Sequence, residues 1–486
     1  MRWLDLAVIG VYLAGITWFG VQFRSSQKSL KDYFLGGRTA PWWAIALSIV
    51  SAETSTLTVI GAPALAFQGN FAFLQLVLGY LLARVVIATL FLPAYFRGEL
   101  FTAYELIRVR FGERARKLTA AMFLVLRALA EGVRVFAISI VISILLGTGQ
   151  VGSIAVILCL TLIYTYEGGM TAVIWTDVVQ MGLYIAGAAF SLIAILSHIP
   201  GGWAHVVAIG ARFGKFQIFD FRLGAPSEFF SRSYSFWAGI LGGCFLTTAS
   251  HGAEQLMVQR LLAARSQAQS RGALFASWLV VAAQFTLFLF IGACLFTFYS
   301  DRHLPAPAVP DSIYPQFVWS YLPSGAAGLI MAAILAAAMS NLSAALNSLA
   351  STTVVDFLRP FAPGGVSERM WVLVARFATV FWALTLFALA LLARRWGGVL
   401  QAGLSIASVL YGSLLGVFLL GILTRRIRES SAIAGMIAGL AVMIYVRFAT
   451  PIAFTWYVLI GTAATFAVGV MASWVFDRPC SRTRRW

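Results

Sequence analysis

Apolar segments long enough to cross a lipid bilayer recur along the whole sequence, and this recurrence limits the fold more than any other feature. A membrane-spanning helix needs about 20 mainly apolar residues, and about thirteen segments reach or approach that length. Only 11% of the 486 residues are charged and 60% are hydrophobic, so the chain cannot give a soluble domain an ordinary polar surface. We therefore predict an all-α polytopic membrane protein. The segments are 4–23, 41–66, 70–95, 118–147, 150–166, 171–197, 235–255, 273–298, 326–355, 370–393, 398–423, 431–448 and 452–476.

The basic residues fall mostly in alternate loops between these segments. Cytoplasmic loops of membrane proteins carry an excess of lysine and arginine, so the net charge of +17 indicates membrane topology and not a nucleic-acid partner. Clusters follow the odd-numbered segments, which predicts an external N-terminus and a cytoplasmic C-terminus. The compact chain suggests a bacterial inner membrane, where the external side is the periplasm. The external segment 198–234 is also basic, but long loops weigh less in this rule. The clusters are Arg24 to Arg38, Arg97 to Lys117, Arg260 to Arg271, Arg359 and Arg369, Arg425 to Arg428, and the terminal RTRRW.

The ninth apolar segment contains an unusually polar stretch, MSNLSAALNSLASTTVVDF, at residues 339–357. Ser340, Ser343 and Asn347 are spaced by three and four residues, so they share one face of a helix. Neutral hydroxyl and amide oxygens, together with backbone carbonyls, suit a partly dehydrated alkali cation. The alternative is that small polar residues hold helices together within the membrane.

The second segment contains a similar polar patch, SIVSAETSTLTVIGAP, at residues 48–63. Hydroxyl residues and Glu53 are followed there by Gly61 and Pro63, which indicates a helix that is broken near mid-depth. Backbone that leaves helical geometry inside a membrane must be buried in protein or line a cavity. We therefore expect this segment to border a binding site.

Charged residues occur inside two other apolar segments. Asp177 lies several residues inside the sixth segment, where a carboxylate is costly and functional by default; its alternative role is a structural salt bridge to an arginine. In the fourth segment, Arg127, Glu131 and Arg134 are spaced by four and three residues and are expected to pair along one face. A net positive charge would then remain for an anionic group, unless Arg127 extends to the membrane surface.

Several motifs resemble those of the sodium/solute symporter family, which contains bacterial proline, sugar and sialic acid transporters and the animal sodium/glucose cotransporters. The resemblance runs over nearly the whole chain. Its most specific part is GGMTAVIWTD at 168–177, joined by LPAYFR with TAYELIRVRFG between 92 and 112, EQLMVQRLLAARS at 254–266, MSNLSAALNS in the ninth segment and LLGVFLLGILTRR at 414–426.

This resemblance implies a LeuT-type core of two inverted five-helix repeats that carries out sodium-coupled symport of a small polar organic solute by alternating access. Residues 1–486 would form a single transmembrane transporter domain. Within it, 1–38 would be an extra helix and a cytoplasmic loop, 39–428 the inverted-repeat core, and 429–486 the C-terminal helices and basic tail. Na⁺ would be the coupling ion, and the lipid bilayer and the solute the other partners.

The resemblance also implies binding residues. The sodium site would combine backbone carbonyls of Leu47, Val50 and Ala337 with the side chains of Ser340 and Asn341, where Asn341 replaces the usual serine or threonine. A second sodium site would use Asp177 and Ser343, with Ala344 in place of a hydroxyl residue. Ser51 and Thr54 resemble the hydroxyls that hold a carboxylate in sialic acid transporters, so a carboxylate or acidic sugar is favoured. The substrate cavity would be lined by Ser51, Thr54, Ser55, Gln75, Arg134, Glu254 and Gln255.

Other functions remain open from the sequence. A proton-coupled symporter that uses Asp177 or Glu53 and a sodium-coupled transporter of a neutral sugar are the nearest alternatives. An integral membrane enzyme would need a histidine or metal cluster in one cavity, and the four cysteines and four histidines are scattered along the chain. A channel would conduct without saturable uptake.

Overall fold

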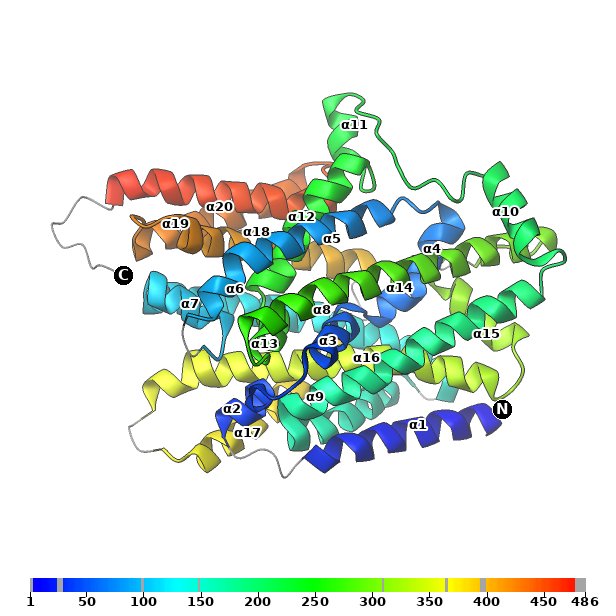
Figure 1. Ribbon diagram of the computed structural model, residues 1–486, viewed down its shortest axis with the longest axis horizontal. Helices are drawn as coiled ribbons and strands as arrows, with labels where there is room; N and C mark the ends of the chain where they lie inside the picture. Colours follow the sequence, from blue (N-terminus) through cyan, green and yellow to red (C-terminus); the bar gives the residue numbers. More distant parts are fainter. Residues whose placement is uncertain are drawn as a thin grey trace.

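The protein is a bundle of helices in the computed structural model, which describes residues 3–23, 29–97, 100–146, 149–307, 310–362, 366–393 and 399–476. The first described end of α1 and the last described end of α20 lie at opposite ends of the bundle (Figure 1). The basic tail, Arg24 and Lys28 lie outside the described residues. The helices of the first half are α1 (Trp3–Val21), α2 (Leu30–Leu35), α3 (Trp42–Glu53), α4 (Thr56–Gln68), α5 (Leu74–Val86), α6 (Leu92–Tyr95), α7 (Ala103–Arg110), α8 (Glu113–Leu146), α9 (Gln150–Ser197) and α10 (Gly202–Arg212). They are followed by α11 (Pro226–Ser231), α12 (Gly243–Thr248), α13 (Gln255–Leu262), α14 (Gln267–Asp301), α15 (Ile313–Tyr321), α16 (Ala326–Thr352), α17 (Glu368–Ala393), α18 (Val399–Leu423), α19 (Glu429–Ala449) and α20 (Phe454–Phe476).

Helices occupy the predicted apolar segments, but length and hydropathy together identify fewer spans than expected. Among the described residues, eight helices are long and apolar enough to cross a membrane, or nine if the bent pair α3 and α4 is one span. The fifth and sixth predicted segments are the two parts of α9, which is interrupted at Gly169 (φ 53°, ψ −150°). Only glycine adopts this backbone conformation readily, which explains the position of the interruption. The expected number of thirteen spans stays a prediction.

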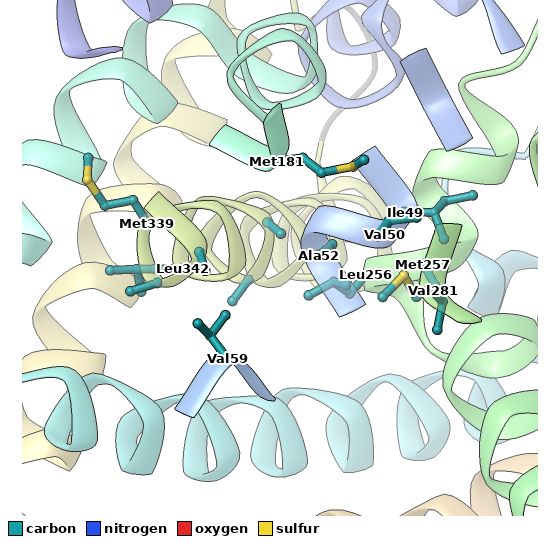
Figure 2. Close-up of a cluster of buried hydrophobic side chains, with 14 of the residues drawn as sticks. Ile49, Val50, Ala52, Val59, Met181, Leu256, Met257, Val281, Met339 and Leu342 are labelled. Carbon is teal, nitrogen blue, oxygen red and sulfur yellow. The ribbon is translucent and has the colours of Figure 1, made fainter. Parts of the chain in front are cut away.

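Helix α16 lies at the centre of the bundle. In its most apolar stretch 94% of the residues are buried, against 22% for α1 at the periphery. Its many alanines allow close approach by α1, α3, α8, α9 and α17. Figure 2 shows the apolar side chains around its midpoint, namely Met339 and Leu342 of α16 itself, Ile49, Val50 and Ala52 of α3, Val59 of α4, Met181 of α9, Leu256 and Met257 of α13, and Val281 of α14.

Two helical segments are broken near this central helix. Between α3 and α4 the chain bends by 61°, and Thr54 and Ser55 are extended there. The second break is at Glu254 (φ −90°, ψ 131°), between the π-helical segment η5 (Ala249–Ala253) and α13. Such breaks free backbone groups for ligands at membrane depth, as the polar patch in the second apolar segment predicted.

The N-terminal helix α1 is attached to the core through Asp5. One carboxylate oxygen of this buried residue accepts hydrogen bonds from the backbone amides of Gly325 and Gly328, each at 2.7 Å. These amides belong to the first turn of α16, where a negative charge is stabilised by the helix dipole. The bond therefore fixes the position of α16 relative to α1.

Candidate functional site

A narrow cavity opens beside the first helix break. Its polar side chains are Ser55 at the break, Glu131 and Arg134 on α8, and Asn341 on α16. The cavity can therefore offer a hydroxyl, a carboxylate, a guanidinium and an amide to a small polar solute. The remaining lining residues are apolar, namely Val135, Ile138, Ile157, Ala338 and Leu342.

An ion network forms the polar wall of this cavity. Glu131 accepts from Arg127 at 2.9 Å and from Arg134 at 3.2 Å, which confirms the predicted pairing along α8. Arg127 also donates to Glu254 at 3.3 Å, and Glu254 accepts from the hydroxyl of Tyr411. The expected surplus of positive charge is wrong, because Glu254 from the second break supplies another carboxylate and balances the two arginines.

Arg134 is the arginine of the network that reaches the cavity. Its side chain is 28% exposed, against 5% for Arg127. All of its hydrogen bonds within the described residues use Nη1, which donates to Glu131 and to Asn341. Its Nε and Nη2 groups are therefore available to an acceptor on a bound solute.

Asn341 joins the broken helix to the two arginines. Its amide nitrogen donates to the carbonyl oxygen of Ala52 at 2.7 Å. Its amide oxygen accepts from Arg127 and from Arg134, each at 3.1 Å. The oxygen that was expected to bind sodium thus faces two guanidinium groups in this structure.

A second polar cluster connects α3, α9, α13 and α16, and all its side chains are almost completely buried. The Ser340 hydroxyl donates to Asp177 at 2.6 Å and lies 2.7 Å from the Ser51 hydroxyl. The other oxygen of Asp177 accepts from Ser48 at 2.5 Å and from Arg260 at 2.9 Å. The structure thus brings one residue from each predicted sodium site into direct contact, and it supplies the salt bridge that was the alternative role of Asp177.

The remaining predicted sodium residues lie close to this cluster along α3 and α16. The carbonyl of Val50 accepts from the amide of Thr54 at 2.9 Å, and the Ser343 hydroxyl donates to the carbonyl of Ser340 at 2.9 Å. Leu47 is one turn before Ser51, and Ala337 is one turn before Ser340 and Asn341. The centre of α16 thus lies next to both breaks, because Asn341 is bonded to Ala52 before the first break and, through Arg127, to Glu254 at the second.

Three predicted substrate residues have partners outside the cavity. Gln75 donates to the carbonyl of Tyr234 at 2.8 Å and accepts from the amide of Asp220, so it holds the segment 198–234. Gln255 accepts from the amide of Ala103 at 2.7 Å. Thr54 exchanges hydrogen bonds with Gln284 on α14, at 3.1 and 2.8 Å.

Arg260, Ser48 and Tyr411 were not identified from the sequence. Arg260 was counted among the basic loop residues, but it lies in α13 and is 1% exposed. The arginine stands only a few residues after an apolar segment, and local sequence does not reveal that the chain folds back into the protein there. Its place in the EQLMVQR motif was the available signal.

The second half of the polar stretch in α16 serves helix packing. Asn347 accepts from Gln259 of α13 at 2.5 Å, and Ser351 donates to the other amide atom of Gln259 at 3.3 Å. Further along, Asp356 accepts from Thr102 at 3.0 Å. From Asn347 onward the polar residues join helices, as the alternative interpretation predicted. Ion binding near Ser340 stays a prediction.

Known proteins are similar to this chain in architecture and in sequence. A solved structure of a Na⁺-coupled sialic acid symporter in a substrate-bound outward-open state superposes with a TM-score of 0.88 at 28% identity, covering 97% of this chain and 98% of the other. The sodium/sialic acid symporter of Proteus mirabilis is 28% identical over 97% of this chain and 95% of its own length. The human sodium-coupled monocarboxylate transporter 1 is 28% identical over 90% of this chain and 71% of its own length.

These similarities define the fold as LeuT-type and the protein as a multi-pass membrane transporter and not an enzyme. The sequence model of the sodium:solute symporter family matches residues 33–439, and the chain belongs to this family of sodium-coupled symporters.

Proposed function

We propose that the protein imports a small organic solute that carries a carboxylate and hydroxyl groups, such as an acidic sugar or a hydroxy acid, together with sodium. The observation that carries this proposal is the free Nε and Nη2 edge of Arg134 in the cavity. A planar guanidinium edge matches a carboxylate through two parallel hydrogen bonds. Glu131 and Ser55 line the same cavity and accept hydrogen bonds from hydroxyl groups.

The names of similar proteins support an anionic solute. One relative is named for sialic acid and another for monocarboxylates, and both solutes carry a carboxylate. The balanced charge of the ion network also suits a solute with both acidic and hydroxyl groups, since Glu131 would repel a bare anion.

For sodium, we propose a site built around Ser340, with the carbonyls of Leu47, Val50 and Ala337 and a contribution from Asp177. Asn341 would join this site only if its oxygen left the two arginines, so we place it with the substrate cavity. Ser343 would contribute to a second ion through its position one turn after Ser340. Sodium would replace the hydrogen bonds between Ser340, Ser51 and Asp177.

The number of sodium ions bears on what the transporter can accumulate. One charge that crosses 100 mV gains about 2.3 kcal/mol, and a tenfold sodium gradient adds about 1.4 kcal/mol. With one sodium ion and a monoanion the electrical contribution cancels, which leaves about tenfold accumulation. With a second sodium ion, the total accumulation of the solute would reach the order of a thousand-fold or more. An anionic solute therefore favours two sodium ions.

In the transport cycle, sodium would first stabilise an outward-open state by joining α3 to α16, and the solute would then bind beside the break. We propose that 39–428 is the inverted-repeat core. The breaks at Thr54 and Glu254 would then each lie in the first helix of one five-helix repeat. The first described end of α1 and the last described end of α20 lie at opposite ends of the bundle (Figure 1). This arrangement suits a periplasmic N-terminus and a cytoplasmic C-terminus in an inner membrane.

The test of this function is ligand-dependent thermal stability of the purified protein. We expect sodium, compared with choline, to raise the melting temperature, and a carboxylate to raise it further in sodium, because a ligand that binds the native state stabilises it by mass action. The panel would contain N-acetylneuraminate, lactate, pyruvate, glucose and proline. Stabilisation by glucose alone would show a neutral-sugar transporter, and a response that needs no sodium would show another coupling ion.

Replacing Arg134 with glutamine should weaken binding of the carboxylate identified in that panel by about 10- to 100-fold, since a hydrogen bond to a charged group is worth about 1.5–3 kcal/mol. The fold should persist because Glu131 keeps its bond to Arg127. The solute concentration that gives half-maximal thermal stabilisation measures this loss. Arg369→Gln, at an exposed position on α17, is the matched control and should bind like the natural protein. Equal affinity in both variants would exclude Arg134 from the site.

A further inference from the structure

A third ionisable cluster is centred on Glu53, next to the first helix break. Glu53, the last residue of α3, accepts hydrogen bonds from Arg84 of α5 at 3.1 Å and from Nε2 of His251 at 3.2 Å. His251 is 2% exposed and Arg84 is fully buried. The three residues thus connect α3, α5 and η5 inside the bundle.

Arg84 balances Glu53 without help from His251. Besides its bond to Glu53, it donates to the carbonyls of Leu274 at 3.2 Å and Tyr80 at 3.3 Å, so its guanidinium is held in one position. The pair of Glu53 and Arg84 is neutral overall. A neutral His251 keeps the cluster neutral, and a protonated His251 adds one net positive charge.

Both protonation states of His251 can satisfy their hydrogen bonds in this geometry. The hydroxyl of Ser250 lies 2.9 Å from Nδ1 and 3.4 Å from the carbonyl of Thr247. With neutral histidine the hydroxyl donates to Nδ1, and with protonated histidine it accepts from Nδ1 and donates to Thr247. In either state Nε2 donates to Glu53.

Few other ionisable groups face this cluster. Tyr80 on α5 and Tyr184 on α9 interact electrostatically with Glu53. Glu254, at the end of η5, is engaged by Arg127 and by Tyr411 of α18. The side chain of Glu53 is 15% exposed, so it is less buried than Arg84 and His251. Among the described residues of this cluster, His251 is the side chain that can take up a proton and still keep both of its hydrogen bonds.

The cluster lies beside both helix breaks, where we expect the helices to rearrange during transport. Glu53 immediately precedes the break at Thr54, and His251 lies three residues before the break at Glu254. Their hydrogen bond therefore joins the two broken helices whose rearrangement we expect during transport. Leu47 and Val50, whose carbonyls we assign to sodium, lie on the same helix as Glu53.

We propose that His251 and Glu53 form a proton-binding site that opposes sodium binding through α3. A proton on His251 adds a positive charge beside the end of the helix that would hold sodium, and like charges repel within the low dielectric of the protein. By reciprocity, sodium binding would release the proton. This coupling depends on the sodium-bound function proposed above, whereas proton binding itself does not.

The sodium midpoint of thermal stabilisation, measured on the full-length purified protein between about pH 5.5 and pH 8, tests the coupling. We expect the midpoint at the acid end to be at least about fivefold higher than at the alkaline end. His251→Gln keeps a donor toward Glu53 but cannot titrate, and its midpoint should change less than about twofold. His205→Gln is the matched control, because it removes a partly exposed histidine that is paired with Asp301 at 3.0 Å. This control should keep the full pH dependence.

A pH-independent midpoint in the natural protein, a lower midpoint at acid pH, or an unchanged pH dependence in His251→Gln would overturn the proposal. If sodium does not stabilise the protein at any pH in this range, the proposed sodium coupling is wrong, and the proton site is still untouched by that result. The proton site is then tested by the melting temperature in choline buffer, whose pH dependence should differ between the natural protein and His251→Gln. If that variant does not fold, calorimetry of sodium binding to the natural protein in buffers of different ionisation enthalpy decides, because our proposal requires proton release.

Discussion

Replacing Ser340 with alanine should raise the sodium concentration needed for half-maximal thermal stabilisation by about 10- to 100-fold. The hydroxyl of Ser340 contacts both Ser51 on α3 and Asp177 on α9. Its loss removes a sodium ligand and leaves buried oxygens with fewer partners, at a cost of about 1–3 kcal/mol. The sodium concentration needed for half-maximal uptake in proteoliposomes should rise by the same factor.

Ser348→Ala is the control for this substitution. Ser348 is equally buried on the same helix, but among the described residues its hydroxyl bonds only to the carbonyl of Ala345, one turn earlier. The control removes one buried serine hydroxyl from α16 without disturbing the cluster around Asp177. Ser340 does not bind the ion if Ser340→Ala leaves the sodium midpoint unchanged. The same conclusion follows if both variants raise the midpoint equally.

Replacing Arg260 with glutamine should destabilise the protein by about 3–5 kcal/mol, because it leaves the fully buried Asp177 without a compensating charge. Arg260 also donates to Ser48 at 2.9 Å and to the carbonyl of Leu256 at 2.9 Å, so α13, α3 and α9 lose a common partner. The yield of folded protein and its melting temperature should both fall. Arg265→Gln, where the arginine is exposed and donates to the carbonyl of Thr39, should have little effect.

The double variant Asp177→Asn with Arg260→Gln distinguishes a structural ion pair from two independent contributions. Because both charges are then absent, we expect the double variant to recover part of the stability that Arg260→Gln loses, with a coupling of about 0.5–3 kcal/mol. Additive losses would mean that the ion pair itself contributes little. If Asp177 also binds sodium, the double variant should lose its response to sodium even where its stability recovers.

Local sequence patterns predicted the elements of this protein well because they depend on periodicity and polarity within one segment. The apolar runs located the helices, and the hydroxyl-rich residues before Gly61 and Pro63 located the break between α3 and α4. The spacing of Arg127, Glu131 and Arg134 on one helix predicted their pairing. Each of these features is decided by neighbours three or four residues away, and helix geometry is regular at that range.

The partners of buried polar groups depended on tertiary structure. The sequence showed that Asn341, Gln75, Gln255 and Arg260 are polar residues in or near apolar segments. It did not show that Asn341 faces two arginines, that the two glutamines hold loops, or that Arg260 is buried against Asp177.

A hydrogen bond needs its atoms within about 3 Å, and that distance is determined by how α3, α8, α13 and α16 cross one another. Near the helix breaks, side chains meet partners that are far away in the sequence, such as Ser51 and Ser340, which are 289 residues apart. From the sequence alone we could predict the membrane helices, the broken span and the sodium symporter class. The packing of the broken helices against α16 decided which residues form the cavity, the candidate ion cluster and the histidine site.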